Sequence, residues 1–445
     1  MRRNAPHQHQ RRYYYDPIVG SRVAMLGGSW VPKAPVGGLP GLALNFSGQT
    51  AWQSGAPVSL ASTFSFTRAT QAWDSQPDGS LVSVASGSPR YGGGLGFLPE
   101  GARTNLLLQS GDFNTSWTIT TATVTPGATT GVDNTASASS VVLSGSGGGT
   151  AQSVTISAAS TTTVSVYAKP FATNWLRVRL QAGADIKAVW FNIAAGTVGT
   201  TNPVGTEITA IVGSIQSAAN GFYRCIVKVT TATVTTLSSS FIPTSADTVN
   251  GAAADSCYLD KSQAEAGATA TSYITTTVAT ATRNGDSMII TGAPFTAGLT
   301  AAEGTMFLEL ENDATCPVVG QAVGICNTAS PTANNRISIS SINTGIAYAI
   351  TDGGVSQVTP TAVLGNTRPT KTRVAMRYKL NDSNFSVKGG VVASDTTCTI
   401  PAGMDRIVIG SAAHSPGGAP IEARISRVAF WPTGLVNSDL VALSA

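Results

Sequence analysis

Apolar and polar residues alternate along this chain in short segments typical of β-strands. In residues 176–181, aliphatic side chains alternate with two arginines and a glutamine, and residues 223–230, 306–311 and 373–380 alternate in the same way. Successive side chains of a strand point to opposite faces, so each segment predicts one buried and one solvent-facing side. Further strands are expected at 162–168, 188–193 and 424–431. A short helix is expected from Asn437 or Ser438 through Leu443.

These elements fall into distinct stretches of the chain. Residues 104–283 and 284–445 each contain many short strands separated by turns, which predicts two β-sandwiches. Residues 1–20 predict an extended arm, and the irregular, Gly/Pro-rich residues 21–103 predict a β-rich attachment region. The predicted fold is therefore all-β, with two tandem sandwiches of jelly-roll type after an arm and an attachment segment.

The chain carries few charges, and they are unevenly placed. Only 11% of its 445 residues are charged, and the net charge is +4. Arg2, Arg3, Arg11 and Arg12 precede the first acidic residue, Asp16, so the remaining chain has no net basic field and we expect no nucleic-acid partner. A low surface charge favours a protein packed beside copies of itself, and we expect a homo-oligomer, most plausibly a trimer.

The arm combines these arginines with three consecutive tyrosines, Tyr13, Tyr14 and Tyr15. Tyrosine is favoured at protein interfaces, which suggests an arm that docks on another protein. A frayed terminus is the alternative.

The sequence offers little for catalysis. Its histidines are His7, His9 and His414, and no serine or cysteine lies in a nucleophile motif. Glu309 and Glu311, two apart on one predicted strand, are expected to face solvent together. We expect no enzyme and assign no catalytic residue and no cofactor.

Candidate ligands for metals are also weak. Asp112, Asn114, Asp133 and Asp255 have the oxygen ligands that Ca²⁺ prefers, but their spacing is not diagnostic, and capping of turns is the alternative. We assign no metal site and leave a structural calcium open.

The five cysteines form no C-x-x-C pair. Cys225, Cys257 and Cys398 lie in strand patterns and are expected to be buried thiols. Whether Cys316 and Cys326 form a disulfide stays open.

Sugar binding usually needs an exposed aromatic ring. Trp190 and Trp431 lie in predicted strands and favour the core, whereas Trp175 follows a predicted loop and is the best candidate for a glycan contact.

Residues 96–117 carry a family resemblance. Phe97, Glu100 and the run Ala102–Leu106 match a Gly-Leu-Leu-x-Glu-x-Ala-Arg-Thr-Asn-Leu pattern, with Pro99 in place of an aliphatic residue. The preceding Phe-Thr-Arg-Ala (66–69) and Pro-Arg-Tyr (89–91) fit it, as do the later Gln-Ala-Glu-Ala-Gly (263–267) and Ser-Tyr-Ile (272–274). This set resembles bacteriophage virion structural proteins, in which it frames a jelly roll similar to a carbohydrate-binding module. Residues 284–445 resemble, less closely, the concanavalin-like or laminin-G-like sandwich that often follows.

The resemblance implies a tail fibre or tail-associated protein, anchored by its N-terminus on other virion proteins and projecting its sandwiches towards a host-surface glycan. A capsid decoration or head-fibre protein and a carbohydrate-binding module protein are the alternatives. The N-terminus shows no apolar signal segment and the chain has no membrane-spanning run, so we expect assembly in a host cytoplasm and a place in the virion.

Overall fold

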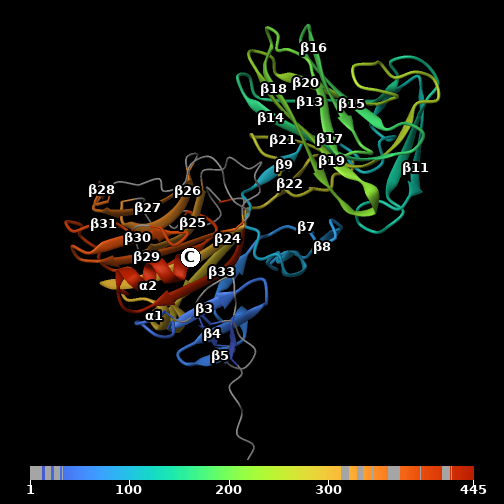
Figure 1. Cartoon of the computed structure of the whole chain (residues 1–445). Coiled ribbons are helices and arrows are strands. Elements are labelled where there is room, and N and C mark those ends of the chain that lie inside the picture. The colour runs from blue at the N-terminus through green and yellow to red at the C-terminus, as the bar shows by residue number, and fades with distance from the viewer. Residues whose placement is uncertain are drawn as a thin grey trace, which may run out of the picture. The chain divides into compact units, whose positions relative to one another are not determined.

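The computed structural model describes residues 31–32, 34–311, 320–327, 334–342, 345–358, 371–390, 392–412, 421 and 423–445, with the backbone of 13–15 and 22–24. The chain divides into two compact units (Figure 1). Unit 1 comprises Met1–Thr67, Pro89–Gly101 and Gly285–Ala445, and unit 2 comprises Arg68–Ser88 and Ala102–Asn284. Each unit contains two large antiparallel sheets, so the predicted all-β fold with two β-sandwiches is confirmed.

Unit 1 packs a seven-stranded sheet against an eight-stranded sheet. The seven-stranded sheet has the order β28 (Val355–Ser356), β27 (Gly345–Asp352), β26 (Arg336–Ile342), β25 (Gly320–Cys326), β32 (Arg406–Ile409), β23 (Ser287–Thr291), β6 (Ser65–Thr67). The eight-stranded sheet has the order β31 (Ala393–Asp395), β30 (Ser383–Val387), β29 (Thr372–Lys379), β24 (Glu303–Glu311), β33 (Arg424–Trp431), β3 (Leu42–Asn45), β4 (Thr50–Gln53), β5 (Ala56–Val58). A short helix, α1 (Gly292–Gly298), follows β23.

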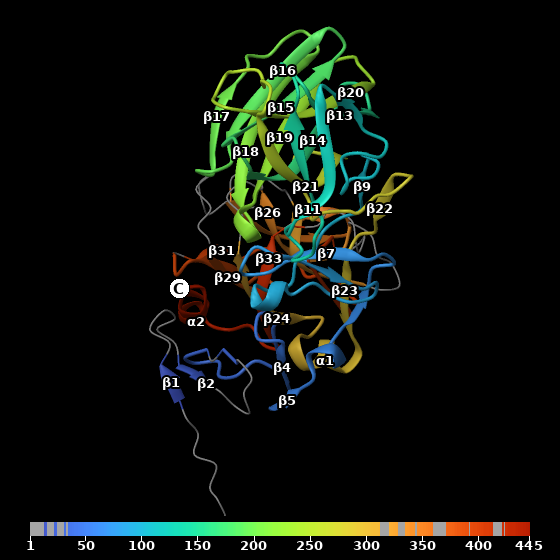
Figure 2. The ribbon, with the colours of Figure 1, turned by 90° about the vertical axis from the view of Figure 1, so that its right-hand side faces the viewer.

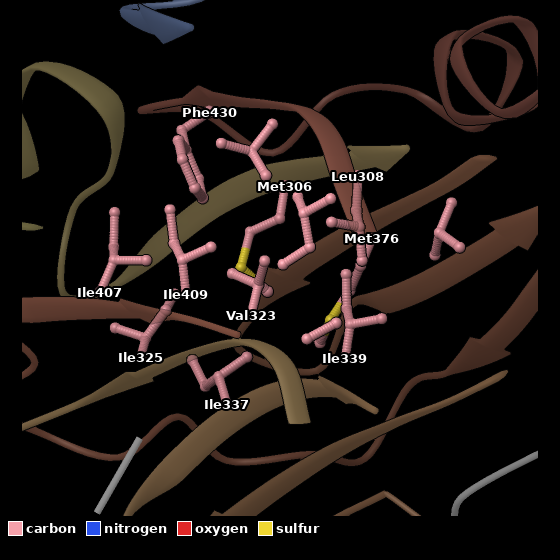
Figure 3. Close-up of a cluster of buried hydrophobic side chains, with 14 of the residues drawn as sticks. Met306, Leu308, Val323, Ile325, Ile337, Ile339, Met376, Ile407, Ile409 and Phe430 are labelled. Carbon is pink, nitrogen blue, oxygen red and sulfur yellow. The ribbon is translucent and has the colours of Figure 1, made fainter. Parts of the chain in front are cut away.

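One apolar core lies between these two sheets. Figure 3 shows part of it, with Met306 and Leu308 of β24 meeting Val323 of β25 and Ile339 of β26. Met306, Leu308 and Leu310 all belong to this core, which confirms the alternation predicted for residues 306–311.

Strands from residues 42–67 complete both sheets of unit 1. β3 pairs with β33, so that Leu42 lies opposite Phe430, and β6 pairs with β23. Without β3, one side of β33 would be an open sheet edge with unpaired backbone groups. The expected separate attachment region at 21–103 therefore differs from the structure: residues 34–67 and 89–101 belong to unit 1, and residues 68–88 to unit 2. This region has too few periodic apolar residues for a core of its own, so its strands join cores formed by later residues.

The outer face of the eight-stranded sheet is covered by α2 (Asn437–Ser444), which lies along β29 and β30 (Figure 1). Its Leu440 and Leu443 pack with Trp431 of β33. The predicted C-terminal helix is confirmed, but the residue at its N-cap position is Val436, so the predicted cap was wrong.

Glu309 of β24 is also buried, contrary to the expectation that it faces solvent. Glu309 is only 2% exposed. Its carboxylate accepts a hydrogen bond from Arg373 Nε at 2.8 Å and lies 3.7 Å from Arg427 Nη1. Glu311, at the strand end, is partly exposed. The period-two pattern predicted the side of the sheet correctly but could not show that another layer covers it.

Part of the family-like pattern forms a buried ionic cluster in unit 1. Arg90 is fully buried and its guanidinium binds the carboxylates of Glu100 and Asp286. The Asp286 carboxylate also accepts the Glu100 backbone N–H at 2.9 Å. Burial alone would lower the pKa of Arg90, but the two carboxylates outweigh it and raise that pKa. The Pro-Arg-Tyr and Glu positions of the pattern thus serve the fold.

Unit 2 is a sandwich of two six-stranded sheets, whose strands can be followed in Figure 2. The first has the order β10 (Thr118–Thr120), β13 (Gly149–Thr155), β20 (Thr236–Thr244), β15 (Trp175–Ala182), β16 (Asp185–Asn192), β17 (Thr197–Thr201). The second has the order β11 (Ala122–Thr129), β12 (Ala138–Leu143), β21 (Ser256–Ala266), β14 (Thr161–Pro170), β19 (Tyr223–Thr231), β18 (Ile208–Ser217). Two two-stranded sheets accompany them: β9 (Arg103–Asn105) pairs with β22 (Ala281–Arg283), and β7 (Ala72–Ser75) forms a hairpin with β8 (Leu81–Val84).

The rest of the family-like pattern closes unit 2. Asn105 is fully buried, and its side-chain amide donates to the carbonyls of Ser262 and Ile274 at 3.1 and 2.8 Å. Its side-chain oxygen accepts the backbone N–H groups of Leu107 and Ala264, both at 3.1 Å. One side chain thus joins residues 105–107 to residues 262–264 and to Ile274, both of which lie much further along the chain.

The later part of the pattern, residues 263–267 and 272–274, also stabilises the fold of unit 2. Gln263 accepts the backbone N–H of Ile274 at 2.7 Å and donates to Glu265 at 2.7 Å. The buried Glu265 accepts both the backbone N–H and the hydroxyl of Thr271, at 2.8 and 2.6 Å. Burial raises the pKa of Glu265, and this effect outweighs the hydrogen bonds, which lower it. The residues that carry the resemblance therefore hold this sandwich together.

The arm lies mostly outside the described residues, including Arg2, Arg3, Arg11 and Arg12. The backbone of β1 (Tyr13–Tyr15) pairs antiparallel with β2 (Arg22–Ala24). The docking role of the arm remains a prediction.

Cys225, Cys257 and Cys398 are buried free thiols, as predicted. The Sγ of Cys326 accepts a hydrogen bond from Arg406 Nε at 2.9 Å, whereas Cys316 lies outside the described residues. Among the helices that the structure describes, none is long and apolar enough to cross a membrane.

Candidate functional site

The outer face of β15 in unit 2 presents an unusual row of side chains. Leu176, Val178 and Leu180 of this strand point into the core. Trp175, Arg177, Arg179 and Gln181 consequently lie on the opposite face, and all four are partly exposed. We refer to these four residues as the β15 row.

Arg177 is held in a fixed position at the centre of the row. Its guanidinium carbon lies 5.1 Å from the ring centroid of Trp190 on β16, the residue directly opposite it in the sheet. Its Nη1 donates to Asn250 Oδ1 at 2.6 Å, and Trp190 Nε1 donates to the Val249 carbonyl at 3.0 Å. The loop that carries Val249 and Asn250 therefore buttresses the arginine and buries the Trp190 ring beneath it.

No described residue forms an ion pair that neutralises the positive charge of the row. Arg179 donates to Gln181 Oε1 at 3.1 Å, and within the described residues neither Arg177 nor Arg179 forms an ion pair. Arg177 Nε is buried and has no hydrogen-bond acceptor among the described residues. Burial, and then the neighbouring charge of Arg179, lower the pKa of Arg177. By contrast, Arg90 and Arg373 in unit 1 each bind a carboxylate.

Trp175 stands at the start of the row beside the edge strand β17. A Cβ on Gly199 of β17 would lie 2.6 Å from Trp175 Cζ3 and 2.9 Å from Asp247 Oδ1, so this glycine lets ring and carboxylate approach the strand. Asp247 accepts the backbone N–H and hydroxyl of Thr200 at 3.1 and 3.0 Å. The indole N–H of Trp175 has no acceptor among the described residues.

The other sequence candidates have structural positions. Trp190 and Trp431 are buried, as predicted, although Trp190 lies under the β15 row and not between the sheets. Asp112 accepts backbone N–H groups of its own turn, and Asp255 accepts the Ala252 N–H at 2.8 Å. In the part of the chain that the structure describes, no three His, Cys, Asp or Glu side chains gather as a metal site would need. His7, His9 and His414 lie outside it.

Asp133 forms an ion pair with the buried ammonium group of Lys261. Lys261 Nζ lies 2.9 Å from Asp133 and 3.1 Å from Asp260. Lys261 occupies a β-bulge in β21 with a positive φ of 42°, so its side chain emerges on the same face as that of Asp260. Burial raises the pKa of Asp133, but hydrogen bonds from Lys261 and Thr135 outweigh it and lower that pKa to about 2. The lysine thus serves as an internal cation for this carboxylate pair.

Comparison with known proteins adds little beyond the fold. No family model matches the sequence, and no curated protein matches it. Similar solved structures include the CBM40 domain of the Ruminococcus gnavus IT-sialidase, with 12% identity, a TM-score of 0.28, and 33% of this chain and 84% of that chain covered. Mouse laminin α1 domains LG4-5 have 12% identity and a TM-score of 0.22, and the match covers 75% of this chain and 88% of that chain. The Trypanosoma rangeli sialidase in complex with sialic acid has 11% identity and a TM-score of 0.28, and the match covers 66% of this chain and 52% of that chain. Each is a likeness of fold alone.

Proposed function

We propose that unit 2 is a carbohydrate-binding module that binds acidic glycans through the β15 row. One observation carries the proposal: two neighbouring arginines, which form no ion pair within the described residues, lie beside a partly exposed tryptophan on one face of a sheet. Guanidinium groups bind carboxylates and sulfates through paired, charge-assisted hydrogen bonds. A sugar stacked on Trp175 would place its acidic group within the field of Arg177 and Arg179.

The site is also preorganised. Stacking on Trp190 and the hydrogen bond to Asn250 fix Arg177 before any ligand binds, so little conformational freedom remains to be lost. An anion would relieve the repulsion between the two guanidinium groups, which contributes to the lowered pKa of Arg177. A neutral glycan would not do so. We therefore expect selectivity for carboxylated or sulfated sugars.

The test is a glycan array of neutral, carboxylated and sulfated sugars, probed with the full chain and with Trp175→Ala and Arg177→Ala. Lys228→Ala is the matched control, because Lys228 lies on β19 in the other sheet and its replacement removes the same charge. We expect acidic glycans to bind, at least tenfold weaker binding by both β15-row variants, and unchanged binding by the control. Absent binding, or equal losses in all three variants, would contradict the proposal.

A second candidate is a virion structural protein. It is supported by the phage-like sequence pattern, whose matching residues Asn105, Gln263 and Glu265 hold unit 2 together and so are expected wherever this domain recurs. In this reading the chain is a homo-oligomer, most plausibly trimeric, and a tail fibre or, alternatively, a capsid decoration or head-fibre protein. Tyr13, Tyr14 and Tyr15 of the arm would dock on other virion proteins, and the β15 row would contact the host glycan.

Deleting residues 2–15 tests the second candidate separately. The deletion should prevent incorporation into particles while both units stay folded and glycan binding persists. Normal incorporation of the shortened chain would count against an anchoring arm.

A further inference from the structure

Phe171 is the one phenylalanine or tryptophan among the described residues that is largely exposed, at 53%. It follows directly after β14 and lies on Tyr258 of β21, with ring centroids 4.9 Å apart and planes inclined by 30°. The two rings form a small aromatic surface. The local sequence pattern favoured Trp175, four residues further along, and did not single out Phe171.

The exposure of Phe171 does not come from a loose loop. The next two residues are tied to the start of β21: Thr173 donates its backbone N–H and its hydroxyl to the Ser256 carbonyl at 3.1 and 2.9 Å. In return, the Ser256 backbone N–H donates to the Thr173 hydroxyl at 3.2 Å, and Ala172 N donates to the Ser256 hydroxyl at 3.3 Å. A fixed, exposed ring loses little entropy when a ligand stacks on it.

The ammonium group of Lys169 lies beside this surface. Lys169 Nζ is 5.3 Å from the Tyr258 ring centroid and 4.8 Å from that of Phe222. Among the described residues it has neither a carboxylate nor a hydrogen-bond acceptor. Burial against these rings lowers its pKa, because the ammonium is partly removed from water. An anion placed here would gain a charge-assisted contact that the protein itself does not supply.

We propose that Phe171, Tyr258 and Lys169 form a second site of unit 2 for an acidic sugar, in which the sugar face stacks on Phe171 and its anionic group contacts Lys169. The ligand class rests on the proposed function, but the site does not share a residue with the β15 row. It lies on the other sheet, so each chain would hold two separate sugars. Two sites on one module raise the apparent affinity for a polymer or a glycan-covered surface far above that of either site.

The test measures stoichiometry on the full chain by isothermal titration with two carboxylated probes, galacturonate trisaccharide and 3′-sialyllactose. The variants are Phe171→Ala, Trp175→Ala and the double variant, and Phe171→Leu is a control that keeps apolar bulk but removes the ring face. We expect two sites per wild-type chain for at least one probe, one site in each single Ala variant and in Phe171→Leu, and none in the double variant. On immobilised polygalacturonate, either single Ala variant should lose at least 100-fold in apparent affinity, at the lower end of typical avidity gains.

The outcomes separate the two claims. One wild-type site that Trp175→Ala removes and Phe171→Ala preserves would overturn this inference and leave the proposed function standing. One site that only Phe171→Ala removes would support the Phe171 site and overturn the β15 row. Absence of binding to both probes would overturn both. Circular dichroism checks folding, and little change is expected because the Phe171 ring is largely in solvent.

Discussion

Replacing Asn105 with alanine tests whether the family-like pattern is a structural closure of unit 2. The substitution removes four hydrogen bonds, two donated and two accepted by one buried side chain. At a net worth of about 1 kcal/mol each, the loss is roughly 4 kcal/mol. For a unit of about 200 residues, this corresponds to a fall in Tm of roughly 8–16 °C.

Differential scanning calorimetry of the full chain measures this effect as a shift of the unit 2 transition. Thr104→Ala is the matched control, because the neighbouring Thr104 hydroxyl makes only one exposed contact, 2.7 Å from the Thr282 hydroxyl. It should cost less than about 1 kcal/mol. If Asn105→Ala were no more damaging than the control, Asn105 would not join these segments as argued.

Three further predictions follow from the same contacts. Arg90→Met leaves two buried carboxylates without their cation and should destabilise unit 1 by about 3–5 kcal/mol in urea unfolding, whereas a loss below about 1 kcal/mol would contradict the buried cluster. Asp133→Asn should destabilise unit 2 at pH 6, and the difference from wild type should vanish as pH falls from about 4 to 2. The reason is that the pKa of Asp133 in the folded protein, about 2, lies below its ordinary value of 3.8. The ion pair with Lys261 therefore stabilises the fold fully above about pH 4, and this contribution is lost as Asp133 becomes protonated. A difference in stability that does not change with pH would refute this. Gly199→Ala should push the Trp175 ring aside and weaken binding of acidic glycans about tenfold, or about 1.4 kcal/mol, while unfolding stays nearly unchanged; undiminished affinity would show that the ring position is unimportant.

Local patterns predicted several of the long strands, because alternation reflects burial directly. Residues 176–181 form part of β15 and residues 306–311 part of β24, with the expected side chains in the cores. The alternation within a strand does not show which other strand it pairs with. Leu42 pairs opposite Phe430 across most of the chain, so the N-terminal region looked like a separate segment when read locally.

The solvent exposure of a strand residue was harder to predict than the face of the sheet on which its side chain lies. The alternation places Glu309 on an outer face, but its burial there beside Arg373 and Arg427 depends on strands far away in the sequence. The outward row of Arg177 and Arg179 was visible in the sequence, whereas the lack of an ion pair to either arginine within the described residues depends on segments far apart in the chain. Phe171 could have been recognised as a residue after a strand-ending Pro170, but its exposure depends on the Thr173–Ser256 contacts.

The central claim, that the β15 row binds acidic glycans, is tested most directly by hydrogen–deuterium exchange of the full chain with and without saturating acidic glycan. Binding there should slow exchange in the loop at 245–250, which buttresses Arg177, and in the β17 edge at 197–201, while β19 at 223–231 stays unchanged. Protection that spares both of these segments would contradict the assignment of the site to the β15 row.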